Sequence, residues 1–213
     1  MIQLIINTGY YLLGLNLILF LIKVNRKRPK SFILFTFYLL VIAFVQYFTS
    51  RLSGKGENNL YLSHVYFLSQ FIILSLFYLE ILENEFQKKI VKISVPFCLI
   101  VLGIQYYLDR ELLLKFNLFE IFITSFLLII FSMFHFYNIL NESKKYYYIN
   151  TGILLYLFGS TVLFISGNLL AKFDNSNSYI VWMLNSILYI VYQIFILIEW
   201  WKMFLEKKIR KHK

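Results

Sequence analysis

The stretch "LSHVYFLSQFIILSLFYLE", Leu62–Glu80, decides the fold, because it is long and apolar enough to cross a lipid bilayer. It nevertheless contains a histidine, a glutamine and a final glutamate. Polar side chains are costly in hydrocarbon, so membrane helices that carry them usually turn them toward the interior of a bundle. The position of these side chains around their helix is therefore the main functional information in this sequence.

Apolar blocks of the same kind recur along the whole chain. Of the 213 residues, 60% are hydrophobic and only 15% are charged, which is too few for a soluble domain of this length. A helix of about 20 residues spans the hydrocarbon core of a bilayer, and seven blocks have that length. We therefore predict an all-α membrane protein, a single bundle of seven transmembrane helices in a domain at 1–203, followed by a basic tail at 204–213. The predicted helices are 2–22, 31–50, 60–82, 90–108, 114–138, 147–170 and 178–201.

The distribution of basic residues predicts the orientation in the membrane. The formal net charge is +10, but the lysines and arginines gather in alternate loops and not on one face, so we expect no nucleic-acid partner. Sixteen of the 21 lie at 23–30, 88–92, 144–145 and 202–213, and five lie in the remaining loops. Basic loops tend to stay in the cytoplasm, so the N-terminus is expected outside and the C-terminus in the cytoplasm. This arrangement requires an odd number of helices, in agreement with seven.

The basic tail is expected to contact anionic membrane lipids, because each basic residue near such a surface contributes about 1 kcal/mol. A docking site for a cytoplasmic or membrane protein partner is the alternative. The chain is rich in Lys, Ile, Phe and Asn and poor in Ala, which indicates an AT-rich bacterial genome. We therefore expect a multi-pass protein of the bacterial cytoplasmic (inner) membrane.

Polar residues of three predicted helices form stripes, and each stripe predicts an inward face. In the third helix the stripe is Tyr66, Ser69, Gln70 and Glu80, in the fifth it is Asn117, Glu120, Thr124, His135 and Asn138, and in the seventh it is Asn185, Tyr189, Tyr192 and Glu199. With the N-terminus outside, the outer halves of these stripes predict a ligand-binding pocket. Its candidate residues are Glu120, Asn185, Tyr189, Gln70, Tyr66, Thr124, Gln46 and Arg51. No cofactor and no metal ion are expected there.

Glu120 is the most informative of these residues. A carboxylate inside a membrane helix is unfavourable unless it is paired or protonated, and Arg51 is a candidate partner. Three interpretations stay open: a structural ion pair or neutral carboxyl, a ligand or proton contact, and a side chain that reaches water. His64 falls on nearly the opposite side of its helix from Gln70, so we expect it at the membrane interface.

Other polar residues have simpler expected roles. Asn16, Gln70 and Asn185 are expected to form hydrogen bonds between helices. Glu80 and Glu199 are expected to extend toward water at helix ends. The small and aromatic residues Gly152, Tyr156, Gly159 and Ser166 on the sixth helix predict close packing against a neighbour.

Residues that would support enzymatic chemistry are scarce, so we expect no enzyme. The last helix has no lysine before Lys202 for a retinal Schiff base, and three histidines in all are few for a zinc hydrolase. The only aspartates, Asp109 and Asp174, lie in predicted loops, which disfavours an intramembrane aspartyl protease. A lipid-modifying enzyme that uses carboxylates alone stays open.

The stretch "GYYLLGLNLILFLIKVNRKRPKSFILFTFYLLVIAFVQYF", Gly9–Phe48, joins a tyrosine-rich helix containing Asn16 to an aromatic second helix through a short basic loop. Together with the helix number and size, it resembles the seven-helix membrane sensor module of bacterial signalling receptors. In that family the module precedes a histidine kinase, a cyclase or a DNA-binding domain, and no such domain follows in this sequence. The resemblance implies a receptor-like sensor that signals through a separate partner, with a small-molecule ligand that the sequence does not identify. A small-solute transporter and an accessory subunit of a membrane complex are the alternatives.

Overall fold

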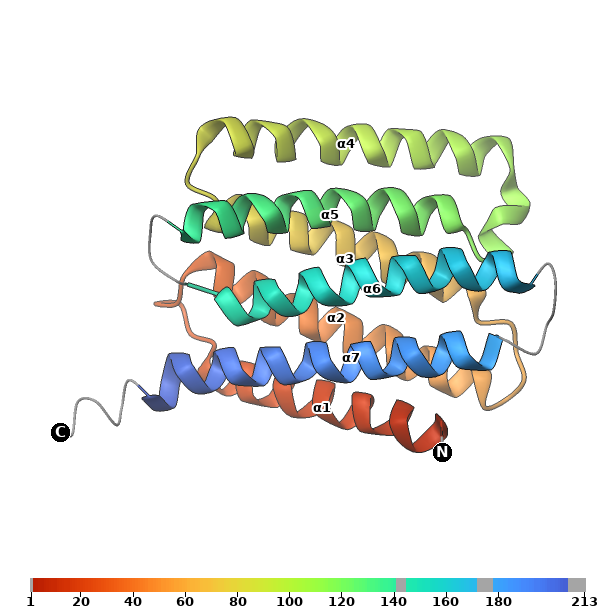
Figure 1. The fold of residues 1–213 in the computed structure, drawn as a ribbon, viewed down its shortest axis with the longest axis horizontal. Coiled ribbons are helices and arrows are strands. Elements are labelled where there is room, and N and C mark those ends of the chain that lie inside the picture. The colour runs from red at the N-terminus through yellow and green to blue at the C-terminus, as the bar shows by residue number, and fades with distance from the viewer. Residues whose placement is uncertain (1, 141–144, 172–177, 207–213) are drawn as a thin grey trace. The chain divides into compact units, whose positions relative to one another are not determined.

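The computed structural model describes residues 2–140, 145–171 and 178–206, and every long element in these ranges is an α-helix (Figure 1). The long helices in chain order are α1 (Ile2–Lys23), α2 (Lys30–Ser53), α3 (Leu60–Ile81), α4 (Glu85–Leu108), α5 (Leu118–Ile139), α6 (Tyr147–Ala171) and α7 (Ser178–Trp201). A short 3₁₀ helix, η1 (Arg110–Leu114), joins α4 to α5, and a π-helical turn, η3 (Lys202–Glu206), follows α7.

All seven long helices have the length and hydropathy needed to cross a membrane. The predicted all-α fold with seven such helices is therefore confirmed, and by length and composition the chain is a multi-pass membrane protein. Three groups of basic residues used for the orientation, at Lys144, at Lys172 and from 207 onward, lie outside the described residues.

Asparagine caps explain where two helices begin. Asn84 Oδ1 accepts hydrogen bonds from the backbone N–H groups of Phe86 (2.8 Å) and Gln87 (3.3 Å), so α4 begins at Glu85 and not at the predicted residue 90. Asn117 Oδ1 accepts from the N–H groups of Phe119 (3.1 Å) and Glu120 (3.3 Å). As a result α5 begins at Leu118, and the residues before it form η1.

Contacts within the chain group the helices into two compact units. The first, here called the central unit, is Val24–His135 and contains α2, α3, α4, η1 and most of α5. The second, here called the terminal unit, is Met1–Lys23 with Phe136–Lys213 and contains α1, α6 and α7. Each unit is described by itself below.

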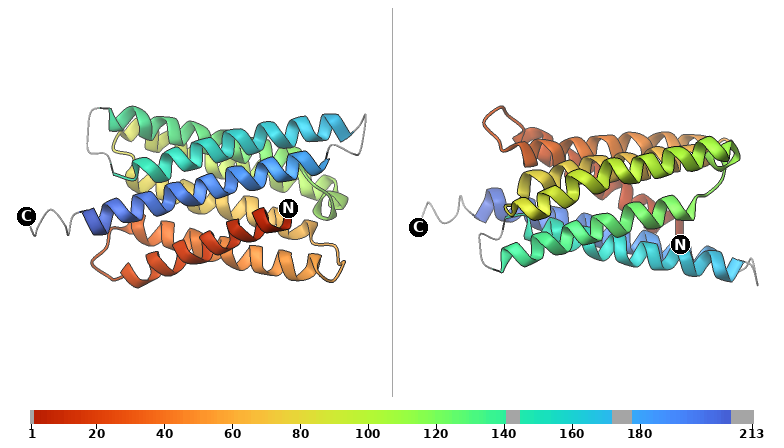
Figure 2. Two further views of the ribbon diagram at one scale, coloured as in Figure 1. Left: turned by 60° about the horizontal axis from the view of Figure 1, so that its bottom comes forward. Right: turned by 90° about the horizontal axis from the view of Figure 1, so that it is seen from above.

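In the terminal unit α7 packs against both α6 and α1 (Figures 1 and 2). A methyl group added to Gly152 of α6 would lie only 2.9 Å from Cδ2 of Tyr192 and from Cβ of Phe195 on α7. The close packing predicted from the small residues of α6 is thus present. On the other side of α7, Asn16 Nδ2 donates to the backbone oxygen and to Oε1 of Gln193, both at 2.9 Å. Asn16 therefore joins two helices, as expected.

Glu199 of α7 is buried, and the expectation that it extends to water is wrong. Its Oε2 accepts a hydrogen bond from the backbone N–H of Tyr148 (2.8 Å), and its Oε1 accepts from Tyr146 (3.2 Å). Tyr146 has a φ of 57°, a left-handed conformation that is unfavourable for a residue with a bulky side chain. The carboxylate thus caps the start of α6, where backbone N–H groups lack partners within the helix and the dipole favours negative charge. Glu80, by contrast, is exposed.

In the central unit α3 contacts α2, α4 and η1 along its length. Phe35 of α2 packs against Phe77 of α3 with ring centroids 5.5 Å apart, and Tyr78 of α3 packs against Phe131 of α5 at 6.3 Å. All four rings are almost completely buried. This aromatic layer fixes α3 between its neighbours and so positions the polar residues nearer its start.

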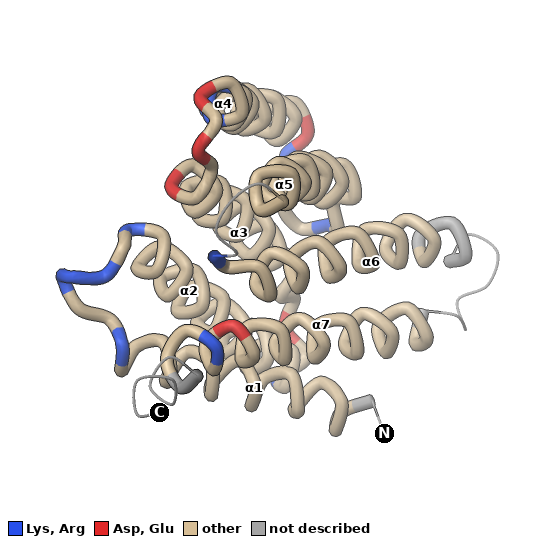
Figure 3. Tube along the Cα trace, turned by 60° about the vertical axis from the view of Figure 1, so that its left-hand side comes forward, with Lys and Arg blue, Asp and Glu red and all other residues tan. Residues whose placement is uncertain are grey.

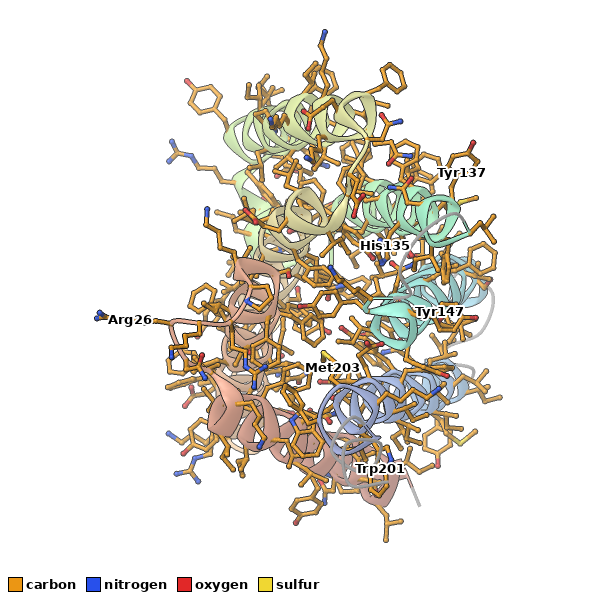
Figure 4. The ribbon with its side chains drawn as sticks, turned by 90° about the vertical axis from the view of Figure 1, so that its left-hand side faces the viewer. Arg26, His135, Tyr137, Tyr147, Trp201 and Met203 are labelled. Atoms are coloured by element: carbon orange, nitrogen blue, oxygen red, sulfur yellow. The ribbon has the colours of Figure 1, made fainter. Side chains whose placement is uncertain are left out.

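The charged residues that the structure describes lie mainly at helix ends and in connections, while the helix bodies are nearly uncharged (Figure 3). Basic residues follow one another in the connection between α1 and α2, where Arg26 extends away from the helices (Figure 4). This pattern is typical of membrane proteins, because charge is excluded from hydrocarbon but tolerated at its boundary.

Candidate functional site

A cluster of polar side chains lies at one end of the central unit, where α3 and α5 begin and α4 ends. We call it the Glu120 cluster, and its members are His64, Gln105, Tyr106, Asn117 and Glu120. His64 comes from the first turns of α3, Gln105 and Tyr106 come from the last turn of α4, and Glu120 comes from the first turn of α5. Three helix ends are therefore joined by side-chain contacts.

The carboxylate of Glu120 is the centre of the cluster. Its Oε2 lies 2.5 Å from Nδ1 of His64, and the hydroxyl of Tyr106 donates to the same oxygen at 2.5 Å. The Tyr106 hydroxyl also lies 2.9 Å from His64 Nδ1. Glu120 is 0% exposed and His64 is 5% exposed, so this pair of ionisable groups is removed from solvent. Short charge-assisted bonds of this kind are among the strongest that proteins form.

Asn117 connects the cluster to the backbone. Its Oδ1 caps the start of α5, while its Nδ2 donates to Oε1 of Gln105 (3.0 Å) and to the Tyr106 hydroxyl (3.1 Å). Because one short side chain makes both sets of bonds, the start of α5 and the end of α4 are held in a fixed relation. Thr124, one turn further along α5, donates to the backbone oxygen of Glu120 at 2.7 Å, a bond within its own helix.

Two buried polar atoms of the cluster have no hydrogen-bond partner among the residues that the structure describes. They are Nε2 of His64 and Oε1 of Glu120. Buried polar groups are nearly always paired, so each unpaired atom in a native core calls for an explanation. Both atoms belong to the pair of His64 and Glu120, so the unpaired polar atoms of the cluster lie on two side chains that contact each other.

Two charged residues in the connection between α4 and α5 form an ion pair with each other. Lys115 Nζ donates to Glu111 Oε2 at 2.6 Å, and both side chains are exposed. The hydrogen bond from Lys115 lowers the pKa of the Glu111 carboxyl, and the charge of Lys115 acts in the same direction. Glu111 is therefore ionised near neutral pH and makes a suitable exposed control for Glu120.

The expected partner of Glu120 is wrong. Arg51 is exposed, and its guanidinium lies 5.8 Å from the centroid of the Tyr47 ring, whereas Glu120 pairs with His64. His64 is buried although it lies on the side of α3 opposite Gln70, because α3 has neighbours on several sides and buries more than the one face that its polar stripe predicts.

The other candidate pocket residues lie in different surroundings. Tyr66 and Gln70 are buried on α3, with Oε1 of Gln70 unpaired, and Gln46 is half-buried on α2. Asn185 and Tyr189 belong to the terminal unit, where Tyr189 packs against Tyr156 with ring centroids 5.7 Å apart. The convergence of all eight residues on one pocket therefore stays a prediction.

Tyr106 is a member of the Glu120 cluster that the sequence did not reveal. Its helix is mostly apolar, and exposed side chains such as Phe97, Ile100 and Tyr107 cover its outer face. The available signal was the short connection from α4 to α5, since a tight connection brings the end of one helix beside the start of the next. The sequence predicts that this helix starts at residue 114 and not at Leu118, so it predicts Glu120 deeper inside the helix and not beside the end of α4.

The Glu120 cluster can accept, hold and release a proton, because it combines a carboxyl and an imidazole in contact. Within the described residues no three His, Cys, Asp or Glu side chains are placed to hold a metal ion together. Comparisons of the chain with protein families, curated proteins and solved structures found no match.

Proposed function

We propose that the protein is a receptor-like sensor module of the bacterial cytoplasmic membrane, and that the Glu120 cluster belongs to its stimulus site. The observation that supports this is a buried ionisable pair, His64 and Glu120, which joins the ends of three helices. The sensor signals through a separate partner that its basic cytoplasmic tail contacts, and the tail also contacts anionic lipid.

The cost of the pair supports a functional role. Removing an ion from water costs several kcal/mol, and well-packed apolar side chains often stabilise a core as well as a buried pair does. An ionisable residue inside a membrane helix is accordingly a default hypothesis for a functional site. A stimulus that alters the bonds of His64, Tyr106 and Glu120 changes the relative stability of helix arrangements, which is what a sensor requires.

In the proposed membrane orientation of the protein, the Glu120 cluster lies toward the cell exterior. It follows from the basic connection 23–30, which is expected in the cytoplasm, and from the alternation of sides along successive helices. The beginnings of α3 and α5 and the end of α4 then face outward.

Cysteine labelling in intact cells tests this orientation. Lys27→Cys and Lys55→Cys place thiols in exposed positions of the two connections that flank α2, and the native Cys98 is buried. We expect a membrane-impermeant thiol reagent to label Lys55→Cys from outside and Lys27→Cys only after permeabilisation. The opposite pattern would place the cluster at the cytoplasmic side and contradict the proposal.

The sensor function is tested with the full chain in lipid nanodiscs. A fluorophore attached through Lys208→Cys reports changes at the tail while pH and a panel of amino acids, sugars and amines are varied. We expect at least one stimulus to change the emission of the wild type and of Glu111→Gln, and we expect Glu120→Gln and His64→Gln to abolish the change. A normal response in both of the latter variants would show that the stimulus site lies elsewhere.

Two further measurements separate the sensor from its alternatives. Uptake of any solute of the same panel into proteoliposomes, dependent on Glu120, would replace the sensor with a transporter. Stoichiometric co-purification with other membrane subunits in mild detergent, without any tail response, would indicate an accessory subunit.

A further inference from the structure

We propose that the ligand of the Glu120 cluster is a single further proton, taken up by the hydrogen-bonded pair of His64 and Glu120. This inference deepens the proposed function, and only its link to signalling rests on that function. Its binding site is the pair of side chains itself, with Tyr106 and Asn117 as the groups that position them.

Two hydrogen bonds end at Glu120 Oε2, and each of them requires one proton. A proton lies between His64 Nδ1 and Glu120 Oε2, which are 2.5 Å apart, and the Tyr106 hydroxyl gives its own proton to the same Oε2. The amide of Asn117 donates to the Tyr106 hydroxyl, which fixes the direction of that bond. With these protons alone, the imidazole is neutral, the carboxylate is ionised, and the pair carries one negative charge.

In that state the two unpaired atoms are both hydrogen-bond acceptors. His64 Nε2 and Glu120 Oε1 each present a lone pair, and neither receives a hydrogen bond. One further proton on either atom makes the pair electrically neutral, as an imidazolium beside a carboxylate or as an imidazole beside a carboxylic acid. A net charge without a counter-ion is strongly disfavoured in an apolar interior, so the surroundings promote uptake of that proton.

Among the described residues, the groups that face the pair supply no compensating charge. On α4, Tyr106 is hydrogen-bonded to Glu120, and the buried Cys98 lies close enough for the charge of Glu120 to act on it. Near η1 the charged side chains Arg110, Glu111 and Lys115 are exposed, and Glu111 pairs with Lys115. On α2, Arg51 is exposed beside Tyr47, and α3 contributes no charged group to the cluster other than His64. Proton uptake is the change within the cluster that neutralises it.

Proton uptake also acts on three helices at once. His64, Tyr106 and Glu120 come from α3, α4 and α5, and all three meet at Glu120 Oε2 or within 2.9 Å of one another. A proton added to the pair weakens or redirects the bonds to that oxygen. The relative stability of the three helix ends therefore depends on the occupancy of one site.

Infrared difference spectroscopy tests the proton site directly. Spectra of the full chain in lipid nanodiscs are recorded between about pH 8 and pH 5, the range in which histidine chemistry normally appears. We expect the wild type and Glu111→Gln to share a carboxylic-acid or imidazolium band that both Glu120→Gln and His64→Gln lack. Persistence of every pH-dependent band in either of those variants would overturn the proposal.

A third variant covers the case in which Glu120→Gln or His64→Gln does not fold. Tyr106→Phe keeps both titrating groups and removes one donor to the ionised carboxylate, so the midpoint of the band should move to higher pH by about one unit. An unchanged midpoint would also overturn the proton site. A band without any tail response would contradict the sensor function alone, and a tail response to a solute without the band would contradict the proton proposal alone.

Discussion

His64→Leu is expected to lower the free energy of unfolding by about 3–5 kcal/mol, because it leaves the carboxylate of Glu120 buried without its partner. The Tyr106 hydroxyl remains as a donor to Oε2, but the imidazole that contacts the same oxygen and can take up a proton is lost. Equilibrium unfolding in mixed micelles, followed by circular dichroism, measures the difference. Glu111→Gln, which alters an exposed carboxylate of the same region, should leave the stability unchanged.

The double variant His64→Leu with Glu120→Leu separates pairing from packing. When both ionisable groups are replaced by apolar side chains, no buried charge remains, and most of the lost stability should return. The double-variant cycle would then show a large coupling energy between the two positions. Equal and additive losses in the two single variants would mean that the pair contributes through packing alone, and would remove the physical basis of the proton site.

Gly152→Leu is expected to destabilise the terminal unit by about 3 kcal/mol, since overpacking a well-filled interface forces side chains and backbone to shift. The added Cβ alone would lie 2.9 Å from Cβ of Phe195, an atom next to the backbone of α7 that cannot easily move away. The same substitution at Gly103 of α4 is the matched control, because no heavy atom lies within 4 Å of its added Cβ.

The comparison of the two glycines is measured by unfolding in mixed micelles and by cross-linking of cysteine pairs placed across α6 and α7. We expect Gly152→Leu to reduce both the stability and the cross-linking yield, and Gly103→Leu to change neither. Equal effects at both positions would indicate that leucine acts through the helix itself and not through the contact of α6 with α7.

Part of the candidate site could be predicted from the sequence. Glu120 was identified because a carboxylate within an apolar helix is unfavourable, and Asn16 was identified as a link between helices for the same kind of reason. The interhelical role of Asn16 is present in its bonds to Gln193. The partner of Glu120 and the contribution of Tyr106 could not be derived, because both depend on which helix ends lie together.

Helical periodicity fails in a specific way for α3. It assigns an inward face to Gln70 and Tyr66, and therefore an outward face to His64. This assumes one buried side for each helix, whereas α3 contacts α2, α4 and η1 and receives side-chain contacts from α5. For a helix with several neighbours, polar residues on opposite sides are buried together. Glu199 was misjudged for a related reason, since its partners are backbone N–H groups at the start of α6.

The sequence by itself determined that the chain forms seven apolar helices, because helix length and hydropathy in a bilayer are set by the residues of each segment alone. It also determined where charge is concentrated, since hydrocarbon excludes charge wherever a helix lies. Only the tertiary structure decided that His64, Tyr106 and Glu120 share one carboxylate oxygen and that Glu199 caps α6. Such pairings depend on the three-dimensional positions of helix ends, and a bond 2.5–3.2 Å long cannot be inferred from residues 14 to 56 positions apart in the chain.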